Sequence, residues 1–293
     1  MDIVVVGSVN MDTVLSVEHL PAEGETVTAR RHFANPGGKG ANQAVAAARL
    51  GREVAFVGCV GADPNGTALA EALRVEGVDT EHLSVVDSPS GMALITVGPS
   101  GANTIVVNLG ANADLSVEQV TAAAEPIEAA AALMCQLEVP IASVAAALTS
   151  AKGLKVLNPA PATRLDADFV ALADVVVPNE TELGAMVNAP PPNGAEQAIG
   201  MARLVAAPVV VVTLGAGGAV FVAGGDSGHI PAPPVTPVDT TAAGDAFCAG
   251  LTDAMVSGRS LPKAVEWAVR VGATTVTRHG AQASLPRRDE VIG

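Results

Sequence analysis

The feature that most constrains the fold is a regular alternation of short, continuously apolar runs with longer alanine-rich segments of helical spacing. The apolar runs are rich in Val, Ile and Leu, as expected of strands buried on both faces of a parallel sheet. The alternation therefore predicts a doubly wound α/β fold, a mostly parallel sheet flanked by helices, which binds ligands at the carboxyl ends of its strands. The expected strands are 2–7, 54–58, 131–137, 154–157, 174–178, 208–213 and 219–223, and the expected helices are 40–50, 66–76, 116–129, 140–152, 180–187, 195–206, 244–256 and 261–277.

Two stretches, 12–34 and 91–108, interrupt this alternation. Apolar and polar residues alternate in both, with turn signals between, which predicts antiparallel strands outside the main sheet. We expect them to form a small antiparallel sheet that projects over the edge of the main sheet. A lid is one use of such a sheet, and a plain extension of the edge fits the pattern equally well. The expected organisation is a single domain over residues 1–293 with this insertion.

The composition excludes several classes of partner. A formal charge of −14 argues against nucleic acid and anionic membranes, since both need a basic surface. Aromatic residues make up 2% of the chain, which disfavours the stacking of bases on aromatic side chains. The opening "MDIVVVGSVNMD" is typical of a first strand rather than a signal peptide, and no apolar run reaches transmembrane length, so we expect a cytoplasmic protein. Cys59, Cys135 and Cys248 form no CxxC motif and are expected to be buried thiols.

The segment "DTTAAGDAF" (239–247) places Asp245 directly behind Gly244, where a loop gives way to a helix. Small residues at a helix start let backbone N–H groups approach an anion closely, and the helix dipole favours negative charge there. An aspartate at this point would lie beside whatever anion is bound. The segment therefore predicts a base next to a phosphate.

The segment "GGKGAN" (37–42) precedes an alanine-rich helix and places Lys39 and Asn42 in its first turn. The helix dipole disfavours a lysine there, so Lys39 needs a counter-anion or a polar ligand. A nucleotide P-loop is excluded, because Phe33 stands where its first glycine belongs and Gly40 where its Ser or Thr belongs. A tight turn with a solvated lysine is the competing interpretation.

Two pairs of polar residues follow strand ends. Asn10 and Asp12 of "GSVNMD" point to one face of an extended chain, where an amide and a carboxylate can grip a diol. An Asx turn that ends the strand is the alternative. Asn179 and Glu182 of "VVPNETE" fit a helix capping box, and they also fit a pair directed at phosphate or metal-bound water.

Two loops complete the pattern. "VTLGAGGAV" (212–220) is a glycine-rich turn behind a strand, suited to close approach by a nucleotide, although Val220 replaces the third glycine of a dinucleotide fingerprint. "VTRHGAQAS" (276–284) follows the last long helix, and its carbonyls together with Asp239 could coordinate an alkali cation through hard oxygen ligands. The nucleophile motif GxSxG does not occur.

In order and spacing, these segments resemble the ribokinase family of sugar kinases, the pfkB-type carbohydrate kinases, from about Val4 to about Arg288. The resemblance implies ATP-dependent phosphorylation of D-ribose at its 5-hydroxyl, with Mg²⁺ bound with ATP and K⁺ or a similar monovalent cation nearby. A kinase for deoxyribose, fructose, a fructose phosphate or a nucleoside is the alternative, and a non-catalytic sugar-binding protein is a further one. An NAD-dependent oxidoreductase is disfavoured by the missing G-x-G-x-x-G.

The resemblance also assigns roles to individual residues. Asp245 would be the catalytic base, and the backbone N–H groups around Ala242, Ala243 and Gly244 would form the anion hole. The sugar would be held by Asn10, Asp12, Gly38, Lys39, Asn42, Glu138 and Asp245. Mg²⁺, phosphates and nucleotide would meet Asn179, Glu182, Thr213, Gly215, Gly217, Gly218 and Gly244. The monovalent cation would lie among Asp239, Thr241, Thr275, Arg278, Gly280 and Ser284, largely on backbone oxygens.

Two further points follow from the resemblance. The small sheet would act as the lid and pair between the subunits of a homodimer. Val269 stands where ribokinases often carry Asn or His near the adenine, so the purine contacts are expected to be looser.

Overall fold

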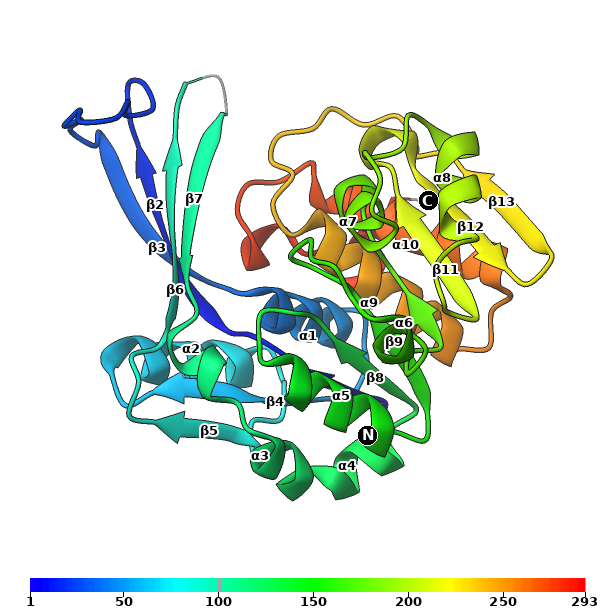
Figure 1. The fold of residues 1–293 in the computed structure, drawn as a ribbon. Helices are drawn as coiled ribbons and strands as arrows, with labels where there is room; N and C mark the ends of the chain where they lie inside the picture. Colours follow the sequence, from blue (N-terminus) through cyan, green and yellow to red (C-terminus); the bar gives the residue numbers. More distant parts are fainter. Residues whose placement is uncertain (100–101, 293) are drawn as a thin grey trace.

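The computed structural model describes residues 1–99 and 102–292, and within these ranges nine strands form one sheet in the order β13-β12-β11-β10-β9-β8-β1-β4-β5. Helices cover both faces of this sheet (Figure 1), which confirms the predicted doubly wound α/β class. The strands are β1 (Ile3–Val6), β4 (Val54–Gly61), β5 (Leu83–Val86), β8 (Ala132–Cys135), β9 (Leu154–Leu157), β10 (Val175–Val176), β11 (Val209–Thr213), β12 (Ala219–Ala223) and β13 (Asp226–Ile230). The helices are α1 (Lys39–Arg49), α2 (Pro64–Val75), α3 (Val117–Ala122), α4 (Ala124–Ala129), α5 (Ile141–Ser150), α6 (Ala167–Val170), α7 (Glu180–Met186), α8 (Ala195–Ala202), α9 (Ala243–Val256) and α10 (Leu261–Thr275).

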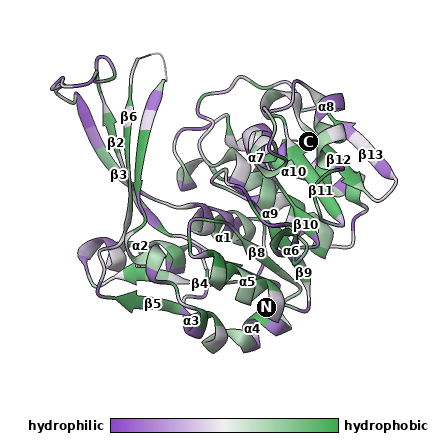
Figure 2. Cartoon of the chain, viewed as in Figure 1, coloured by the Kyte–Doolittle hydropathy of each residue, from purple (hydrophilic) through white to green (hydrophobic). Residues whose placement is uncertain are grey.

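The central strand β1 shows why its apolar run is continuous. Ile3 and Val5 belong to the core that packs against α1, α9 and α10, whereas Val4 and Val6 belong to the core beneath α3, α4 and α5. Successive side chains of a strand point to opposite faces, so a strand covered on both sides needs apolar residues at every position. Figure 2 shows the same hydrophobic colouring along the inner strands, while the edge strand β13 carries hydrophilic residues.

The edge regions depart from the sequence expectation. Strands β5 and β13 differ from the expectation, which did not include them. β12 pairs antiparallel with β11, and β13 pairs antiparallel with β12. The expected helix 116–129 is two short helices, α3 and α4, which meet at Ala123. Pro126 lies in the first turn of α4, where its missing N–H is tolerated. In the middle of one continuous helix the same proline would remove a backbone hydrogen bond, so the segment divides into two helices.

Four further strands of the described chain form a second sheet, in the order β3-β2-β6-β7. They are β2 (Asn10–Ser16), β3 (Arg31–Gly37), β6 (Gly91–Val97) and β7 (Asn103–Asn108). The second sheet stands out from the rest of the molecule (Figure 1). Residues 100 and 101 of the expected stretch 91–108 lie outside the described residues.

The pairing within the second sheet is only partly antiparallel. The hairpins β2–β3 and β6–β7 are antiparallel as expected, but the central pair β2–β6 is parallel. The reason is the connection: the chain runs from β2 to β6 through β3, α1, β4, α2 and β5, and a long crossover of this kind allows parallel pairing where a hairpin does not. The expectation of an all-antiparallel sheet is corrected accordingly.

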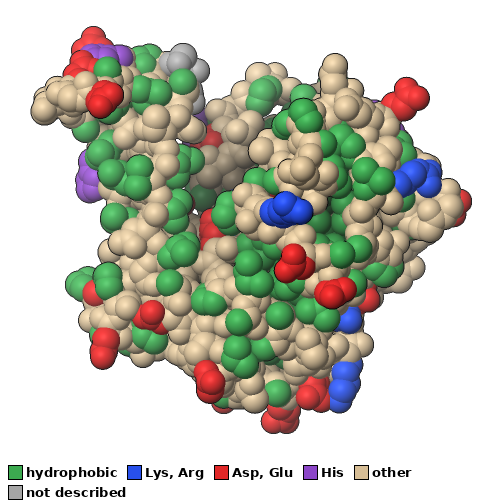
Figure 3. Space-filling model, in the orientation of Figure 1, with side chains coloured by type: hydrophobic (Ala, Val, Ile, Leu, Met, Phe, Trp, Pro, Cys, Tyr) green, Lys and Arg blue, Asp and Glu red, His purple; other side chains and the backbone are tan. Residues whose placement is uncertain are grey.

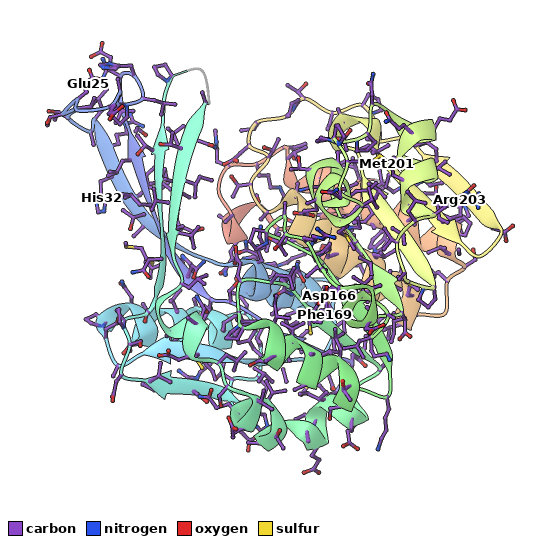
Figure 4. The ribbon with its side chains drawn as sticks, viewed as in Figure 1. Glu25, His32, Asp166, Phe169, Met201 and Arg203 are labelled. Atoms are coloured by element: carbon purple, nitrogen blue, oxygen red, sulfur yellow. The ribbon has the colours of Figure 1, made fainter. Side chains whose placement is uncertain are left out.

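The surface of the second sheet is unusually apolar. Phe33, Ile105, Val106 and Val107 are all exposed on it. Figure 4 labels His32 on β3 and Glu25 on the loop between β2 and β3. Met201 and Arg203, at the end of α8, lie on the opposite side of the molecule. In the described part of the chain, no helix has both the length and the apolar character needed to cross a membrane. The three cysteines are buried free thiols, as expected.

Candidate active site

A cavity of about 230 Å³ lies at the carboxyl ends of the central strands, where this fold class binds its ligands. Asn158 follows β9, Val177 follows β10, and Thr213 ends β11. In the space-filling view the molecule is hollowed between the second sheet and the body, and acidic side chains are visible inside (Figure 3). The cavity is lined by Lys39, Asn158, Ala160, Val177, Asn179, Glu182, Thr213, Thr240, Ala242, Gly244, Asp245 and Cys248.

Asp245 is a buried acid of this cavity and lies in the first turn of α9. The chain enters this helix through Ala242, which has a left-handed conformation with φ of 59°. Each carboxylate oxygen accepts one amide hydrogen bond: Oδ2 from Asn42 Nδ2 at 2.9 Å and Oδ1 from Gln43 Nε2 at 3.1 Å. Burial raises the pKa of Asp245, while Lys39 and the two amides oppose that rise.

Two glycines bring the start of α1 against the end of β1. Gly38 has φ of +89°, a left-handed conformation that suits glycine, and it precedes the first helical residue. At Gly40 a Cβ would lie 2.6 Å from the backbone nitrogen of Ser8, so only glycine allows this backbone contact. The close approach places Lys39 and Asn42 over the strand ends, beside Asp245.

Lys39 lies among carboxylates, which supplies the counter-anion that its position requires. Its Nζ is 4.0 Å from Glu138 Oε1, and its backbone N–H donates to Glu138 Oε2 at 3.1 Å. Ser8 Oγ donates to the same Glu138 oxygen at 2.5 Å. Burial alone would lower the pKa of the Lys39 amine, but Asp245, Glu138 and Glu182 outweigh it and raise that pKa. Lys39 therefore stays charged.

Asn10 and Asp12 lie at the start of β2, where the chain leaves the main sheet. Asn10 is buried, and its Oδ1 accepts a hydrogen bond from Asn112 Nδ2 at 2.7 Å, which leaves its own amide hydrogens for another partner. Burial and the neighbouring charges of Glu138 and Asp245 together raise the pKa of Asp12 to about 7, against the opposing effect of Lys39. The amide of Asn10 is thus fixed by Asn112, and it lies beside the Asp12 carboxyl, which titrates near neutral pH.

The residues of "VVPNETE" form the capping box, and the same two side chains lie at the cavity. Asn179 and Glu182 form a capping box, with Asn179 N donating to Glu182 Oε2 and Glu182 N to Asn179 Oδ1, each at 2.8 Å. Both residues also line the cavity, where Glu182 is buried. Burial raises the pKa of Glu182, although the hydrogen bond from Asn179 and the charge of Lys39 oppose it. A buried carboxylate of this kind gains from a bound cation.

The glycine-rich turn lies beside the cavity rather than in it. Thr213 lines the cavity, whereas Gly215 and Gly217 are exposed in the turn that follows β11. Gly218 packs against β13, because a Cβ there would lie 2.1 Å from the carbonyl oxygen of Ile230. The structure therefore brings Thr213 into the same cavity as Asp245, leaves Gly215 and Gly217 exposed, and buries Gly218 against the end of β13.

The loop before α9 and the loop after α10 are tied together at Asp239. Its Oδ1 accepts from Thr241 N at 2.9 Å and from Thr241 Oγ1 at 2.6 Å, and its Oδ2 accepts from Gly280 N at 2.9 Å. Burial would raise the pKa of Asp239, but these hydrogen bonds outweigh it and lower that pKa. The side chains of Thr275, Ser284 and Arg278 are engaged elsewhere, with Val271 O, Ala281 O and Glu290 respectively.

The donor chemistry bears on which cations these residues suit. Among the described residues, no group of three or more His, Cys, Asp and Glu side chains is arranged to hold a metal ion. A cation here would depend on backbone oxygens and on the ligands that accompany a nucleotide. The two loops joined at Asp239 offer carbonyl oxygens, which suit an alkali cation, and Glu182 offers a carboxylate in the cavity, which suits Mg²⁺.

Sequence reasoning missed several residues that organise the site. Gln43, Gln136 and Asn158 connect Asp245 to the strand ends, and Asn112 and Ser8 hold Asn10 and Glu138. The signal that could have found them is a polar residue inside an otherwise apolar run, such as Gln136 in "LMCQL". Buried amides of this kind need hydrogen-bond partners, so each indicates a defined contact.

Comparison with known proteins places this site in a known class of enzyme. The sequence pattern of the pfkB family carbohydrate kinases matches residues 1–288. A ribokinase of Haemophilus influenzae is 40% identical in an alignment that covers 98% of this chain and 96% of the relative's chain. A ribokinase of Bacillus subtilis is 38% identical, and the alignment covers 99% of this chain and 98% of the relative's chain. The ribokinase crystal structure from Thermotoga maritima, 34% identical, covers 99% of this chain and 98% of its own with a TM-score of 0.91.

The fold and the cavity thus define a carbohydrate kinase. The chain belongs to the pfkB family of carbohydrate kinases, and it has sugar kinase activity of the ribokinase type.

Proposed function

We propose that the protein transfers the γ-phosphoryl group of ATP to the 5-hydroxyl of D-ribose, giving ribose 5-phosphate and ADP. The observation that carries the proposal is Asp245, a buried carboxylate at the start of α9, held by two amides and facing the cavity. The carboxylate would accept the hydroxyl proton as the sugar oxygen bonds to phosphorus and the bond from phosphorus to the ADP oxygen breaks. An ionised carboxylate offers about four acceptor directions, so the two amide bonds leave room for a hydroxyl.

A buried hydrogen-bond acceptor without a partner, the side-chain oxygen of Asn42, supports a ligand rich in hydroxyl groups. Asn42 is buried and uses its Nδ2 on Asp245, and its Oδ1 has no hydrogen-bond partner among the described residues. A buried acceptor without a partner is costly, and a sugar hydroxyl would satisfy it. The amide hydrogens of Asn10 and the carboxyls of Asp12 and Glu138 would bind further hydroxyls, with Gly38 and Lys39 completing the sugar site.

The start of α9 suits the phosphoryl group. The backbone N–H groups of Ala242, Ala243 and Gly244 would form the anion hole, where fixed donors stabilise developing charge without rearrangement. A Cβ on Gly244 would meet no heavy atom within 4 Å, so the space in front of this backbone is open. The N-terminal end of the helix dipole also favours negative charge there.

The nucleotide and its cations would lie on the far side of this anion hole. Thr213 and the turn at Gly215, Gly217 and Gly218 would line the nucleotide pocket, and Asn179 and Glu182 would hold Mg²⁺ with the phosphates. Bound Mg²⁺ would supply charge neutralisation on the phosphate oxygens. K⁺ or a similar ion would take carbonyl oxygens near Asp239, Thr241, Thr275, Arg278, Gly280 and Ser284, and would thereby fix the loop that leads into α9. In support, the solved ribokinase of Arabidopsis thaliana, 31% identical, holds ribose and ATP.

We further propose that the chain acts as one domain whose second sheet closes over the sugar as a lid. The start of this sheet carries Asn10 and Asp12, so its movement would change the sugar site directly. Its exposed apolar residues, including Ile105 and Val106, would be covered by a second subunit in a homodimer. Lid closure would exclude water, which competes as a phosphoryl acceptor.

A related acceptor, 2-deoxyribose, is the second candidate. The specific observation is a deoxyribokinase of Salmonella typhi that is 36% identical and covers 98% of this chain. A sugar phosphate as acceptor is disfavoured, because Lys39 already faces Glu138 and lies close to the charges of Asp245 and Glu182. A second anion in this acidic cavity would be repelled.

The test is a substrate panel. ADP release would be measured with ribose, deoxyribose, fructose, fructose 6-phosphate and adenosine at equal concentrations, and the product would be identified by ³¹P NMR. The proposal expects the highest kcat/KM with ribose and a phosphate on the primary carbon. Preference for a sugar phosphate or adenosine would contradict it, and preference for deoxyribose would favour the second candidate.

A further inference from the structure

A chain of buried amides lies behind Asp245, on the side away from the cavity. Gln43, on the second turn of α1, donates from Nε2 to Asp245 Oδ1 at 3.1 Å and to Asn158 Oδ1 at 3.2 Å. Its Oε1 accepts from Gln136 Nε2 at 2.5 Å. Gln43 and Gln136 are both fully buried, and neither is among the residues that line the cavity.

The direction of this amide chain is fixed by its two ends. Asp245 accepts hydrogen bonds when it is ionised, and Asn158 presents its oxygen because its Nδ2 donates to Val177 O at 2.9 Å. Gln43 must therefore turn its NH₂ group toward both of them and its carbonyl toward Gln136. Gln136 must in turn present its NH₂, and its Oε1 is left buried without a partner among the described residues. The orphaned oxygen is the cost of keeping a donor aimed at Asp245.

We propose that Gln43 is a positioning residue for the catalytic base: it fixes the plane of the Asp245 carboxylate and holds it in the ionised, proton-accepting form. This inference rests on the proposed function, since it concerns how Asp245 acts. Asn42 holds the other oxygen from the cavity side, and its role mixes with sugar binding. Gln43 does not line the cavity, so its hydrogen bond to the carboxylate can be removed without removing a contact to the ligand.

The charged and titratable groups that act on Asp245 define what Gln43 has to balance. Lys39 from α1 favours the ionised form of Asp245, whereas burial and the charge of Glu138 disfavour it. Asp245 in turn raises the pKa of Asp12, Glu182 and the Cys248 thiol. These groups are present in every Gln43 variant. A change in the titration of Asp245 that follows Gln43 substitution is thus assigned to the lost amide donor.

The experiment compares pH profiles of kcat at saturating sugar and ATP in three variants, because kcat/KM for the sugar would also carry the titration of Asp12 in the free enzyme. Gln43→Met keeps the length of the side chain and removes the donor, so the acid limb should move up by about one pH unit, since a hydrogen bond to a charged group is worth that much or more. Gln43→Glu sets a second carboxyl against Asp245 and should move the limb further in the same direction. Ser143→Ala is the matched control: it removes an equally buried side-chain donor, to Leu115 O at 2.6 Å, and neither residue lines the cavity. Its limb should coincide with wild type.

The outcomes separate the possibilities. Each variant is first checked by thermal melting, and profiles are compared over the pH range in which all remain folded. If Gln43→Met lowers the rate equally at every pH with the acid limb unmoved, Gln43 has only a structural role and the inference is overturned. A Gln43→Met profile that superimposes on wild type would overturn it as well, because Gln43 would then have no effect on Asp245. A wild-type enzyme that phosphorylates no sugar would instead refute the proposed function, whatever the variants do.

Discussion

The pKa of Asp12 makes sugar binding depend on pH in a direction that the structure fixes. In the ligand-free site this carboxyl has a pKa of about 7, raised from 3.8 by burial and by Glu138 and Asp245. If a sugar hydroxyl donates to Asp12, binding selects the ionised form and releases a proton below pH 7. A group with this pKa is roughly 10% ionised at pH 6, so sugar affinity should be about tenfold weaker at pH 6 than at pH 8, or about 1.4 kcal/mol.

Isothermal titration calorimetry with sugar alone, without nucleotide, measures this dependence directly. Repeating the titration at pH 6 in two buffers of different ionisation enthalpy counts the protons released, and the expected number approaches one. Asp12→Asn keeps the size of the side chain but cannot titrate, so its affinity should be nearly constant from pH 6 to pH 8. Wild-type affinity that is equal at both pH values, or tighter at pH 6, would refute the reasoning and mean that Asp12 binds as the neutral acid or not at all.

Two further predictions concern parts of the molecule away from the sugar. Asp253 is fully buried and accepts hydrogen bonds from Arg52 at 2.7 Å, Arg288 at 2.7 Å and Trp267 at 3.0 Å. Asp253→Ala leaves these donors without their acceptor, so the free energy of unfolding measured in urea titrations should fall by about 3 kcal/mol, while kcat per folded molecule is retained. A midpoint within experimental error of wild type would contradict this. Replacing Na⁺ by K⁺ in the assay should raise kcat, and Asp239→Ala should remove that response; activation that survives the substitution would show that the cation binds elsewhere.

The sequence predicted the inner part of the fold well because burial leaves a strong pattern. Strands such as β1, covered on both faces, must be apolar at every position, and the continuous run in "IVVV" shows it. The edge strand β13 reads "DSGHI" and is half exposed, so pairing with β12 makes it a strand and its own sequence carries no periodic signal. The parallel pairing of β2 with β6 likewise depends on the path of the intervening chain, which no local pattern records.

The site was predictable to the extent that its residues stand in local motifs. Lys39, Asn42 and Asp245 could be located because a glycine-rich turn or a helix start gives each a defined chemical surrounding. The amides Gln43 and Gln136 could not, because 93 residues separate them along the chain and their role exists only once α1 packs against the end of β8. The raised pKa of Asp12 has the same origin, since it depends on three charged groups that come together only in the fold.

The most direct test of the account is the rate of phosphoryl transfer in Asp245→Asn, measured in a single turnover with sugar and ATP both bound. Asparagine keeps the shape of the side chain and leaves the amides of α9 in place, but it cannot take the hydroxyl proton. We expect the transfer rate to fall by about 10²- to 10⁴-fold while sugar affinity by calorimetry changes little. A transfer rate close to wild type with sugar bound would contradict the assignment of Asp245 as the base.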